Sequence, residues 1–404
     1  MNGTVAQCLG SDGLFRLSGY ETAVGWVAGF DPPLTPNPGV ASGNARAAFE
    51  QAVLNGLRKP PCIIAFSGGR DSSAVLAVAK HLADREGLDP PIAGTHVFTD
   101  DPGSDESSWQ ETVIGHLGVA DWQRVEAEDN FDILGGPAQR GMRKHGQLFP
   151  AMVYAHWPLF GLANGGTLLT GDGGDEILGS QRVTPLLLAA RRRPSRATAR
   201  TAIGVLAPLP VRRAIVARRH KQWSARPWLR PAVAERFTRD LIADDTSEPL
   251  RWDAAVRRRI RQRGPMSAMH NMKVIAREEG AEIIQPFLDP MFVNSLAAKG
   301  GRVGFSGRSE IMGMLFADVL PPELLDRQTK AYFNGVVVGA ASRAFIKRWS
   351  GAGLDPELVD AEALREEWQR PLPHAGTNCL LQAAWLAEEG SSRPVGEMVD
   401  PAPL

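Results

Sequence analysis

The sequence contains little cysteine and has no long apolar run. Its 404 residues include only three cysteines, and Cys8, Cys62 and Cys379 lie far apart. This spacing forms neither a zinc motif nor a redox pair and is typical of a reducing compartment, so we expect a cytoplasmic protein. No apolar run approaches the roughly 18 residues that a membrane span needs, and residues 1–5 lack the features of a signal peptide.

Histidine spacing excludes another class of site. The eight histidines show no spacing typical of metal ligands, so we expect no zinc site built on them. The chain is 43% hydrophobic and its formal net charge is zero. This composition suffices for one large domain or two ordinary domains with a buried core.

A strand, a glycine turn and a helix are predicted around residue 67. The apolar run 62–66 leads into a loop, and an alanine-rich helical pattern continues to about residue 85. The loop reads Ser67, Gly68, Gly69, Arg70, Asp71, Ser72 and Ser73. Glycines allow a sharp turn, and the N–H groups at a helix N-terminus bind anions, so we expect this loop to bind phosphate.

The loop is not a Walker A motif, because it lacks the lysine of that motif. Asp71 stands inside it instead. A carboxylate beside a polyphosphate requires a cation between them, so the sequence predicts Mg²⁺. An ordinary strand-to-helix turn is the alternative interpretation, and the full match of the loop makes it the weaker one.

A second acidic glycine loop follows a short apolar strand over 167–170. It reads Gly171, Asp172, Gly173, Gly174, Asp175 and Glu176. In a parallel sheet both loops would lie at the carboxyl ends of strands, where ligands bind. We therefore expect Asp71 and Asp175 to hold Mg²⁺ together, although either acid alone is also typical of a helix cap.

These motifs resemble those of a known family. The first loop resembles the Ser-Gly-Gly-x-Asp-Ser loop of ATP pyrophosphatases, and the second resembles Gly-Glu/Asp-Gly-Gly/Ser-Asp-Glu of asparagine synthetases. Residues 282–289 are similar to that family's Glu-x-Arg-x-Pro-Phe-Leu-Asp, with Ile284 in place of arginine. Residues 327–335 are similar to its Arg-x-x-Lys-x-x-Phe, and the resemblance extends over about 60–386.

The resemblance implies an enzyme that adenylates a carboxylate with Mg²⁺ and ATP, releases pyrophosphate, and transfers the acyl group to an amine or ammonia. It implies that Lys330 contacts the phosphates during the chemical step. It also implies that Glu282 or Asp172 helps to deprotonate the amine. The nucleotide-binding residues expected from it are Ala65, Ser67, Gly68, Gly69, Asp71, Ser72, Ser73, Phe98, Thr170 and Gly171.

Glutamine-dependent members of that family begin with a glutaminase domain whose nucleophile is the cysteine after Met1. Here residue 2 is Asn2, so we expect a short N-terminal segment, 1–59, without that domain. A synthetase domain over 60–386 and a loose tail over 387–404 follow. The nucleophile would then be free ammonia, ammonia from a partner, or another amine.

These departures favour a specialised amide synthetase for peptide or natural-product biosynthesis, similar to lasso-peptide macrolactam cyclases and β-lactam-forming relatives. One alternative is an ammonia-dependent enzyme similar to asparagine synthetase. Another is an RNA-modifying sulfurtransferase with the same type of loop, which would need paired reactive cysteines. A non-catalytic protein with the same fold would have lost the acids or the lysine, and all of them are present.

Charge is distributed unevenly along the chain. Residues 181–265 contain 21 Lys and Arg but only 6 Asp and Glu, in a pattern that predicts helices. This basic insert could bind an acidic peptide or protein, or it could be a solvated helical face. Aromatic residues do not alternate with the arginines, so we do not expect nucleic-acid binding.

The remaining pattern alternates strands with helices. Strands are predicted over 92–98 and 122–125, and helices over 45–57 and 149–162 and before residue 118. Weak alternation over 13–30 predicts a short hairpin. The fold class expected is α/β, a doubly wound parallel sheet of the adenine nucleotide alpha hydrolase type with a helical C-terminal half.

Overall fold

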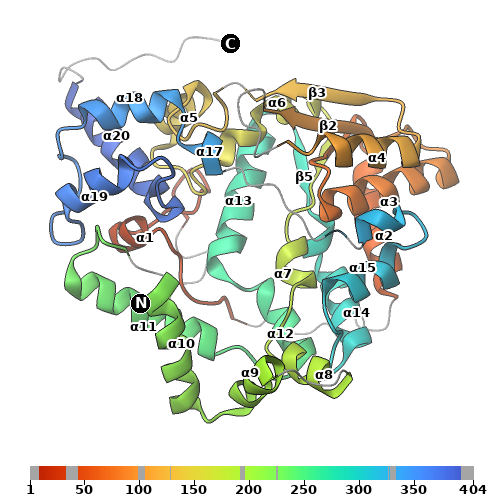
Figure 1. Cartoon of the computed structure of the whole chain (residues 1–404). Coiled ribbons are helices and arrows are strands. Elements are labelled where there is room, and N and C mark those ends of the chain that lie inside the picture. Colours follow the sequence, from red (N-terminus) through yellow and green to blue (C-terminus); the bar gives the residue numbers. More distant parts are fainter. Residues whose placement is uncertain are drawn as a thin grey trace.

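The computed structural model describes residues 9–32, 44–98, 105–127, 129–191, 196–223, 226–325, 327 and 334–392. These residues form a five-stranded, fully parallel sheet in the order β3-β2-β1-β4-β5 (Figure 1). The strands are β1 Cys62–Ala65, β2 Ile92–Val97, β3 Trp122–Glu126, β4 Thr167–Leu169 and β5 Glu282–Ile284. The predicted α/β class with a parallel sheet is therefore confirmed.

Helices surround the sheet. Those up to the second acidic loop are α1 Gly19–Val24, α2 Ala45–Leu57, α3 Arg70–Glu86, α4 Ser107–Leu117, α5 Gly136–His145, η3 Val153–His156 and α6 Trp157–Leu162. The central ones are α7 Gly174–Leu178, α8 Thr184–Arg191, α9 Arg196–Leu206, α10 Leu209–Trp223, α11 Pro231–Thr246, α12 Trp252–Arg259 and α13 Arg263–Glu278. The last are η4 Pro286–Leu288, α14 Pro290–Gly300, α15 Arg308–Phe316, α16 Pro322–Leu325, α17 Asn334–Val337, α18 Ala340–Arg348, α19 Ala361–Trp368, η5 Ala375–Thr377 and α20 Asn378–Ser392.

Both faces of the sheet are covered. Neighbouring residues of β1 point to opposite faces, because side chains alternate along a strand. Ile63 belongs to the hydrophobic cluster on the side of α6 and α13, whereas Ile64 belongs to the cluster on the side of α2, α3 and α14. A strand buried on both faces must be apolar throughout, which explains the continuous apolar run before the first loop.

Phe49 of α2 lies at the centre of one of these clusters. Its ring is fully buried and lies 4.9, 5.2 and 5.0 Å from the ring centroids of Phe287, Phe292 and Phe316. Asn44 caps the helix through a hydrogen bond from the Arg46 N–H to its side chain. The helix therefore joins α14 and α15 to the sheet.

The segment 13–30 is not the hairpin that the alternation predicted. It contains helix α1, which begins with a capping box formed by Ser18 and Glu21. These reciprocal hydrogen bonds satisfy N–H groups at the helix start and outweigh a weak alternation. Asn271 of α13 fixes the preceding residues, since its side chain accepts from the Phe15 N–H at 2.7 Å and donates to the Phe15 carbonyl at 3.1 Å.

Two other expectations need correction. The predicted helix over 149–162 is divided into η3 and α6, because Pro158 lacks an N–H and suits the first turn of a new helix. The tail expected to be loose from 387 is helical up to Ser392, the end of α20, and residues 393–404 lie outside the described residues. Nowhere in the described part of the chain is a helix long and apolar enough to cross a membrane.

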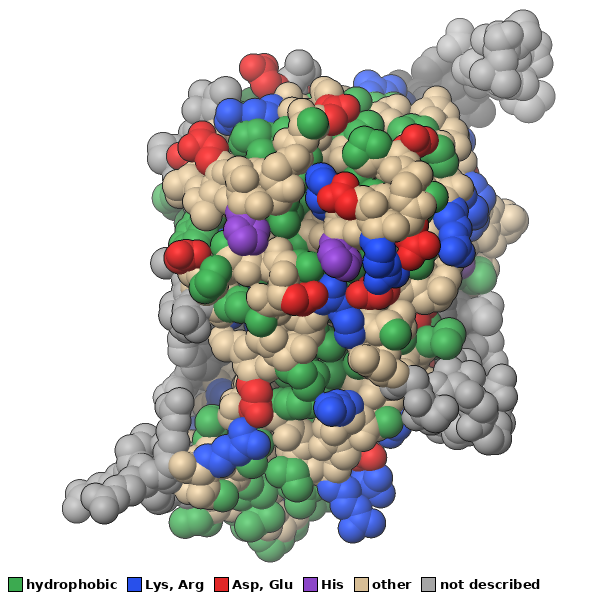
Figure 2. All heavy atoms as spheres, turned by 90° about the vertical axis from the view of Figure 1, so that its right-hand side faces the viewer, with side chains coloured by type: hydrophobic (Ala, Val, Ile, Leu, Met, Phe, Trp, Pro, Cys, Tyr) green, Lys and Arg blue, Asp and Glu red, His purple; other side chains and the backbone are tan. Residues whose placement is uncertain are grey.

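The basic insert forms helices α8 to α12, at the lower end of the molecule in Figure 1. Figure 2 shows hydrophobic side chains gathered at this end. Large apolar side chains that are exposed on α9 and α10 are Ile203, Leu206, Leu209, Val211 and Ile215. The insert is therefore both basic and partly apolar at its surface.

Replacing Phe49 by alanine is expected to lower the free energy of unfolding by about 3–5 kcal/mol, because a buried ring contacted by three others would leave a cavity. Phe49→Leu, the matched control, keeps most of the volume and should lose less. Chemical denaturation of the three proteins measures both values. A loss below about 1 kcal/mol for Phe49→Ala would contradict this packing.

Candidate active site

The two acidic glycine loops lie side by side. They follow β1 and β4, which are hydrogen-bonded neighbours with Ile64 opposite Leu169. Chain order reverses between these two strands, so the loops leave the carboxyl edge at the point where ligands bind in sheets of this type. Parallel pairing alone thus brings residues about 100 positions apart to one place.

The first loop depends on Gly68, whose φ of +82° is a conformation that side chains rarely adopt. A Cβ there would also lie 2.9 Å from Cγ of Gln110. Gln110 supports the loop by donating from Nε2 to the Ser67 carbonyl at 3.2 Å. The turn and its support are therefore matched in shape.

Helix α3 begins directly after this turn. Its N-cap is Gly69, which makes no side-chain capping hydrogen bond. Ser72 Oγ instead donates to the Gly69 carbonyl at 3.1 Å and accepts from the Ser67 N–H at 3.2 Å. A helix start without a capping side chain leaves N–H groups available for an anion, which suits a phosphate.

One guanidinium joins the acids of the two loops. Arg308, the first residue of α15, forms ion pairs with both Asp71 and Asp175. The side chains of Arg308 and Asp71 are only 17% and 16% exposed. Close packing holds the second loop there, since a Cβ on Gly174 would lie 2.2 Å from Cγ of Asp71. The carboxylates therefore converge on a single positive charge.

These contacts perturb the protonation equilibria. Burial raises the pKa of Asp71, and the Arg308 guanidinium opposes that shift. Burial by itself would lower the pKa of Arg308, but Asp71 and Asp175 outweigh it and the pKa is raised. Burial, followed by repulsion from Arg308, lowers the pKa of Arg70.

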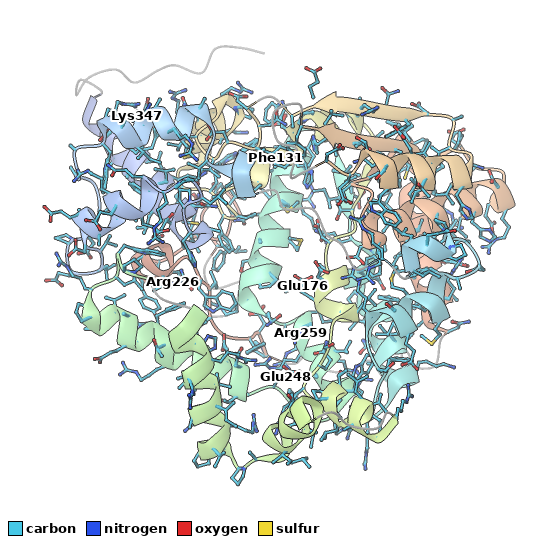
Figure 3. The ribbon with its side chains drawn as sticks, viewed as in Figure 1. Phe131, Glu176, Arg226, Glu248, Arg259 and Lys347 are labelled. Atoms are coloured by element: carbon cyan, nitrogen blue, oxygen red, sulfur yellow. The ribbon has the colours of Figure 1, made fainter. Side chains whose placement is uncertain are left out.

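A cavity of about 530 Å³ opens beside the loops. The phosphate loop, the second acidic loop and Arg308 line it. Its apolar lining residues are Pro265, Met266, Met269 and Leu288, and Leu288 packs against Gly173 of the second acidic loop. Glu176 and Arg259 also line the cavity and lie near the centre of the molecule in Figure 3.

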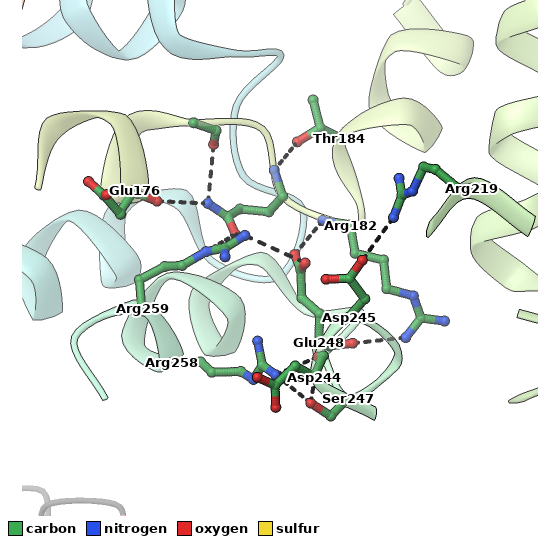
Figure 4. A network of polar contacts seen from close by, with 12 residues as sticks. Glu176, Arg182, Thr184, Arg219, Asp244, Asp245, Ser247, Glu248, Arg258 and Arg259 are labelled. Atoms are coloured by element: carbon green, nitrogen blue, oxygen red, sulfur yellow. Dashed lines mark hydrogen bonds and ion pairs between the residues drawn. The ribbon is translucent and has the colours of Figure 1, made fainter. Parts of the chain in front are cut away.

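Arg259 is held by the basic insert (Figure 4). Its guanidinium donates to Gln181 Oε1 at 3.1 and 3.2 Å and lies 3.5 Å from the carboxylate of Glu248. Glu248 in turn accepts from the Arg182 N–H at 2.7 Å. Some of the arginines of the insert are therefore paired within the protein, and one of them, Arg259, lines the cavity.

A second cavity, of about 320 Å³, adjoins the first. Aromatic rings line it, with Phe98 packed edge-on against Phe131 at 4.7 Å. Ala65, Ser67, His156 and Asp172 line both cavities. These shared residues mark the place where a ligand could extend from the phosphate side into the aromatic side.

Polar groups at this junction contact one another. Thr170 Oγ1 donates to Asp172 Oδ2 at 2.7 Å, and His156 Nδ1 lies 3.4 Å from His96 Nε2. Burial lowers the pKa of His156, and the negative charge of Asp172 opposes this shift. His156 is therefore neutral near pH 7, and Asp172 is the nearby charge that favours its protonated form.

Arg327 also holds the phosphate loop and lines the first cavity. It is buried, donates to the Gly68 carbonyl at 3.0 Å and forms an ion pair with Glu106. Its guanidinium also lies 4.8 Å from the ring of Trp109. Arg327, the first residue of the motif over 327–335, thus reaches the site.

Comparison with known protein families matches residues 44–388 to the family described as asparagine synthase. The chain belongs to the asparagine synthase family. A search of curated individual proteins gave no significant match. Membership means that the protein is an ATP-dependent amide-forming synthetase in the general sense, acting on a carboxylate and an amine or ammonia. The match includes α2, which lies before the boundary expected at residue 60.

Most of the residues expected at the site of this asparagine synthase family member lie there. Those that line one or both cavities are Ala65, Ser67, Gly69, Asp71, Ser72, Phe98, Thr170, Gly171, Asp172 and Asp175. Gly68 shapes the turn from behind. Ser73 is completely buried and lines neither cavity, because it points from α3 into the core.

The structure does not bring Glu282 to the site. It is the first residue of β5, paired with Thr167 at the start of β4, so it lies at the opposite edge of the sheet. Its carboxylate is exposed and forms an ion pair with Lys59 at 2.5 Å. The structure therefore places Glu282 away from both cavities, where the expected role in deprotonating the amine would need it. Lys330 lies outside the described residues.

Sequence reasoning missed Arg308, His156 and Glu106. Arg308 follows Gly307 in a helical stretch that carries no motif, and its role depends on contacts across more than 130 residues. His156 was one of eight histidines without metal-ligand spacing. No local signal distinguished these residues, because the fold alone brings them to the cavities.

The residues present fit the Mg²⁺ that the family implies. Asp71 and Asp175, from different loops, already converge on one cation. Hard divalent ions such as Mg²⁺ take one or two carboxylates and fill their other positions with phosphate oxygens and water. Within the ranges that the structure describes, no cluster of three or more acidic, histidine or cysteine ligands offers a competing metal site.

The histidine pair should make folding stability depend on pH. Burial lowers the pKa of His96 to about 3 from its ordinary 6.5, and His156 adds to that shift. The unfolded chain therefore takes up a proton first, so stability present above pH 6.5 is lost progressively as pH falls toward 3. His96 should thus cost about 2 kcal/mol between pH 7 and pH 5.

We expect His96→Gln to reduce this pH-dependent loss, measured as the difference in unfolding free energy between pH 7 and pH 5. His116→Gln, which replaces an exposed histidine, is the control and should behave as the unmodified protein. An unchanged pH dependence in His96→Gln would show that His96 is protonated normally in the folded state.

Proposed function

We propose that this protein is an AMP-forming amide synthetase that adenylates the carboxylate of a peptide-like substrate and transfers the acyl group to an amine. A lasso-peptide-type macrolactam cyclisation in natural-product biosynthesis is the reaction that we favour. The observation that supports this proposal most is that Asp71 and Asp175, which follow neighbouring strands, both pair with the Arg308 guanidinium. They lie beside a phosphate loop that has no Walker lysine.

The first step follows from the phosphate side of the cavity. A substrate carboxylate oxygen attacks the α-phosphorus of ATP, and the bond to the β-phosphate oxygen breaks, so pyrophosphate leaves with the electron pair. The start of α3 and the hydroxyls of Ser67 and Ser72 support the phosphates. Asp71 and Asp175 would hold Mg²⁺, which when bound supplies positive charge to the diphosphate.

The second step takes place at the junction of the two cavities. The amine nitrogen attacks the acyl carbon, the C–O bond to AMP breaks, and one proton leaves the nitrogen. Asp172 and His156 both line this junction, and His156 is neutral near pH 7. We propose that His156 accepts the proton and that the negative charge of Asp172 stabilises the imidazolium that forms, the role that was expected of Glu282.

The apolar residues that line the first cavity favour a substrate larger than a single polar amino acid. They are Pro265, Met266, Met269 and Leu288, and methionines adapt to irregular apolar groups. Aspartate, the substrate of an asparagine-forming enzyme, has no large apolar group to place against these residues. The apolar lining therefore favours a peptide over the ammonia-dependent, asparagine synthetase-like alternative.

The basic insert supports the same proposal. On α9 and α10, Ile203 is 72% exposed and Leu206 is 62% exposed, close in sequence to exposed arginines such as Arg213 and Arg218. Such a mixture of apolar and positively charged side chains suits an acidic, amphipathic peptide or protein. We propose this face as the place where such a substrate or its carrier docks.

The sulfurtransferase alternative has less support. Burial raises the pKa of Cys62 to about 11 and that of Cys379 to about 12. Both thiols are buried, and neither is a reactive thiolate near neutral pH. Cys8 lies outside the described residues.

The nucleotide products test the proposal. With Mg²⁺ and an accepted carboxylate, we expect AMP and pyrophosphate rather than ADP and phosphate, because the phosphate loop lacks the Walker lysine and resembles the loop of ATP pyrophosphatases, which cleave between the α- and β-phosphates. Asp71→Asn and Asp175→Asn should each lower turnover by about a hundredfold or more. Screening carboxylate and amine pairs for pyrophosphate release measures both, and formation of ADP would reject the assignment.

Lys330 is expected to act in the chemical step rather than in ATP binding. Many backbone N–H groups share the binding of ground-state ATP, so Lys330→Met should keep the ATP affinity within about tenfold and lower the chemical step about a hundredfold. Arginine should not restore the rate, because a planar guanidinium cannot replace a compact ammonium. Calorimetry and pyrophosphate release on the same variants separate the two effects. Full pyrophosphate release by Lys330→Met would remove the lysine from the mechanism.

A further inference from the structure

Arg308 is held in place from outside the site. Its neighbour Glu310 accepts hydrogen bonds from the N–H and Oγ of Ser306, each at 2.6 Å, and pairs with Arg191 of α8 at 3.1 Å. These contacts fix the turn before α15, so the Arg308 side chain extends from a part of the backbone that is held in place. Its guanidinium therefore has a defined reach over the two acidic loops.

Without this residue the two adjacent carboxylates would lose the guanidinium that pairs with both of them, and the positive charge of Arg70 acts on Asp71 less strongly. Asp71 is largely buried, and Asp175 belongs to the neighbouring loop. Negative charge on Asp175 raises the pKa of Asp71 in the same direction as burial does. A buried carboxylate without a countercharge is costly, so a cation must be present before substrate arrives. Arg308 supplies that cation from within the chain.

This arrangement makes Arg308 a competitor of the metal. The two carboxylates that Arg308 contacts are the ones proposed for Mg²⁺. An arriving Mg²⁺–diphosphate brings both a cation for the carboxylates and anionic oxygens for the guanidinium. A guanidinium group can donate two parallel hydrogen bonds to a phosphate, just as it does to a carboxylate. Exchange of partners therefore keeps every charge paired.

We propose that Arg308 is a resident countercation that holds Asp71 and Asp175 together in the nucleotide-free protein and transfers to the phosphates when Mg²⁺–diphosphate binds. The inference rests on the proposed function, because it takes the two acids as the metal ligands. It makes Arg308 a positioning residue in the empty site and a phosphate ligand in the filled one. It also predicts that Mg²⁺ alone binds poorly while Mg²⁺ with diphosphate binds well.

The test uses the full-length protein, calorimetry and two probes, MgCl₂ alone and inorganic pyrophosphate with saturating Mg²⁺. Arg308→Gln should bind Mg²⁺ alone about tenfold more tightly, because its competitor is gone, and bind Mg²⁺–pyrophosphate about tenfold more weakly. These opposite signs identify an exchange, since a purely structural role would weaken both. Arg302→Gln, which replaces an exposed arginine in the preceding turn, is the matched control and should change neither affinity.

Arg308→Lys provides a second reading if the glutamine variant does not fold. A lysine keeps the charge but cannot span both carboxylates as a guanidinium does, so both affinities should fall between those of the unmodified protein and Arg308→Gln. Equal weakening of both probes, or no change in either, would overturn the inference. Failure of the unmodified protein to bind Mg²⁺–pyrophosphate would reject the proposed function instead, and the titration with Mg²⁺ alone would still report on Arg308.

Discussion

The parallel pairing of β1 with β4 is the constraint on which the site depends. Cys62, Ile63 and Ile64 lie opposite Thr167, Leu168 and Leu169, and this register places the ends of both strands at one level. Each strand then turns through glycines into a helix that carries an acid in its first turn. A shift of one residue would turn every side chain to the other face and separate the acids, so the buried pattern of the strands also fixes the geometry of the chemistry.

Electrostatic interactions also constrain how the two acidic loops are arranged. Two carboxylates near each other favour separation of the loops, whereas the guanidinium between them and the close packing at Gly174 favour approach. Arg327 and Glu106 act in the same way behind the phosphate loop, where their ion pair is fully buried and is connected to the Gly68 carbonyl. The loops are thus shaped before any ligand enters, which reduces the ordering that binding would require.

Sequence patterns predicted the features that local physics determines. The β1 run, the turn at Gly68 and the helix after it were predictable because apolar length, glycine and the acidic start all lie within about 25 residues. The sequence could not predict residue positions that depend on contacts between distant parts of the chain. Glu282 matched a family motif, but its place at the start of β5 directs it to the far edge of the sheet. Arg308 gave no signal, since its importance arises only from acids more than 130 residues away.

The opposite orientation of Ile63 and Ile64 has a consequence for the behaviour of the whole chain. The two residues belong to different hydrophobic clusters, one containing α13 and the C-terminal helices and the other containing α2, α3 and α14. A strand shared by both clusters joins them into one cooperative unit. If either cluster unfolds, one face of the shared strand is exposed and the packing of the whole sheet is weakened. A ligand that bridges the loops of β1 and β4 acts at this shared strand. Its binding energy should therefore raise the melting temperature of the complete molecule rather than that of one half.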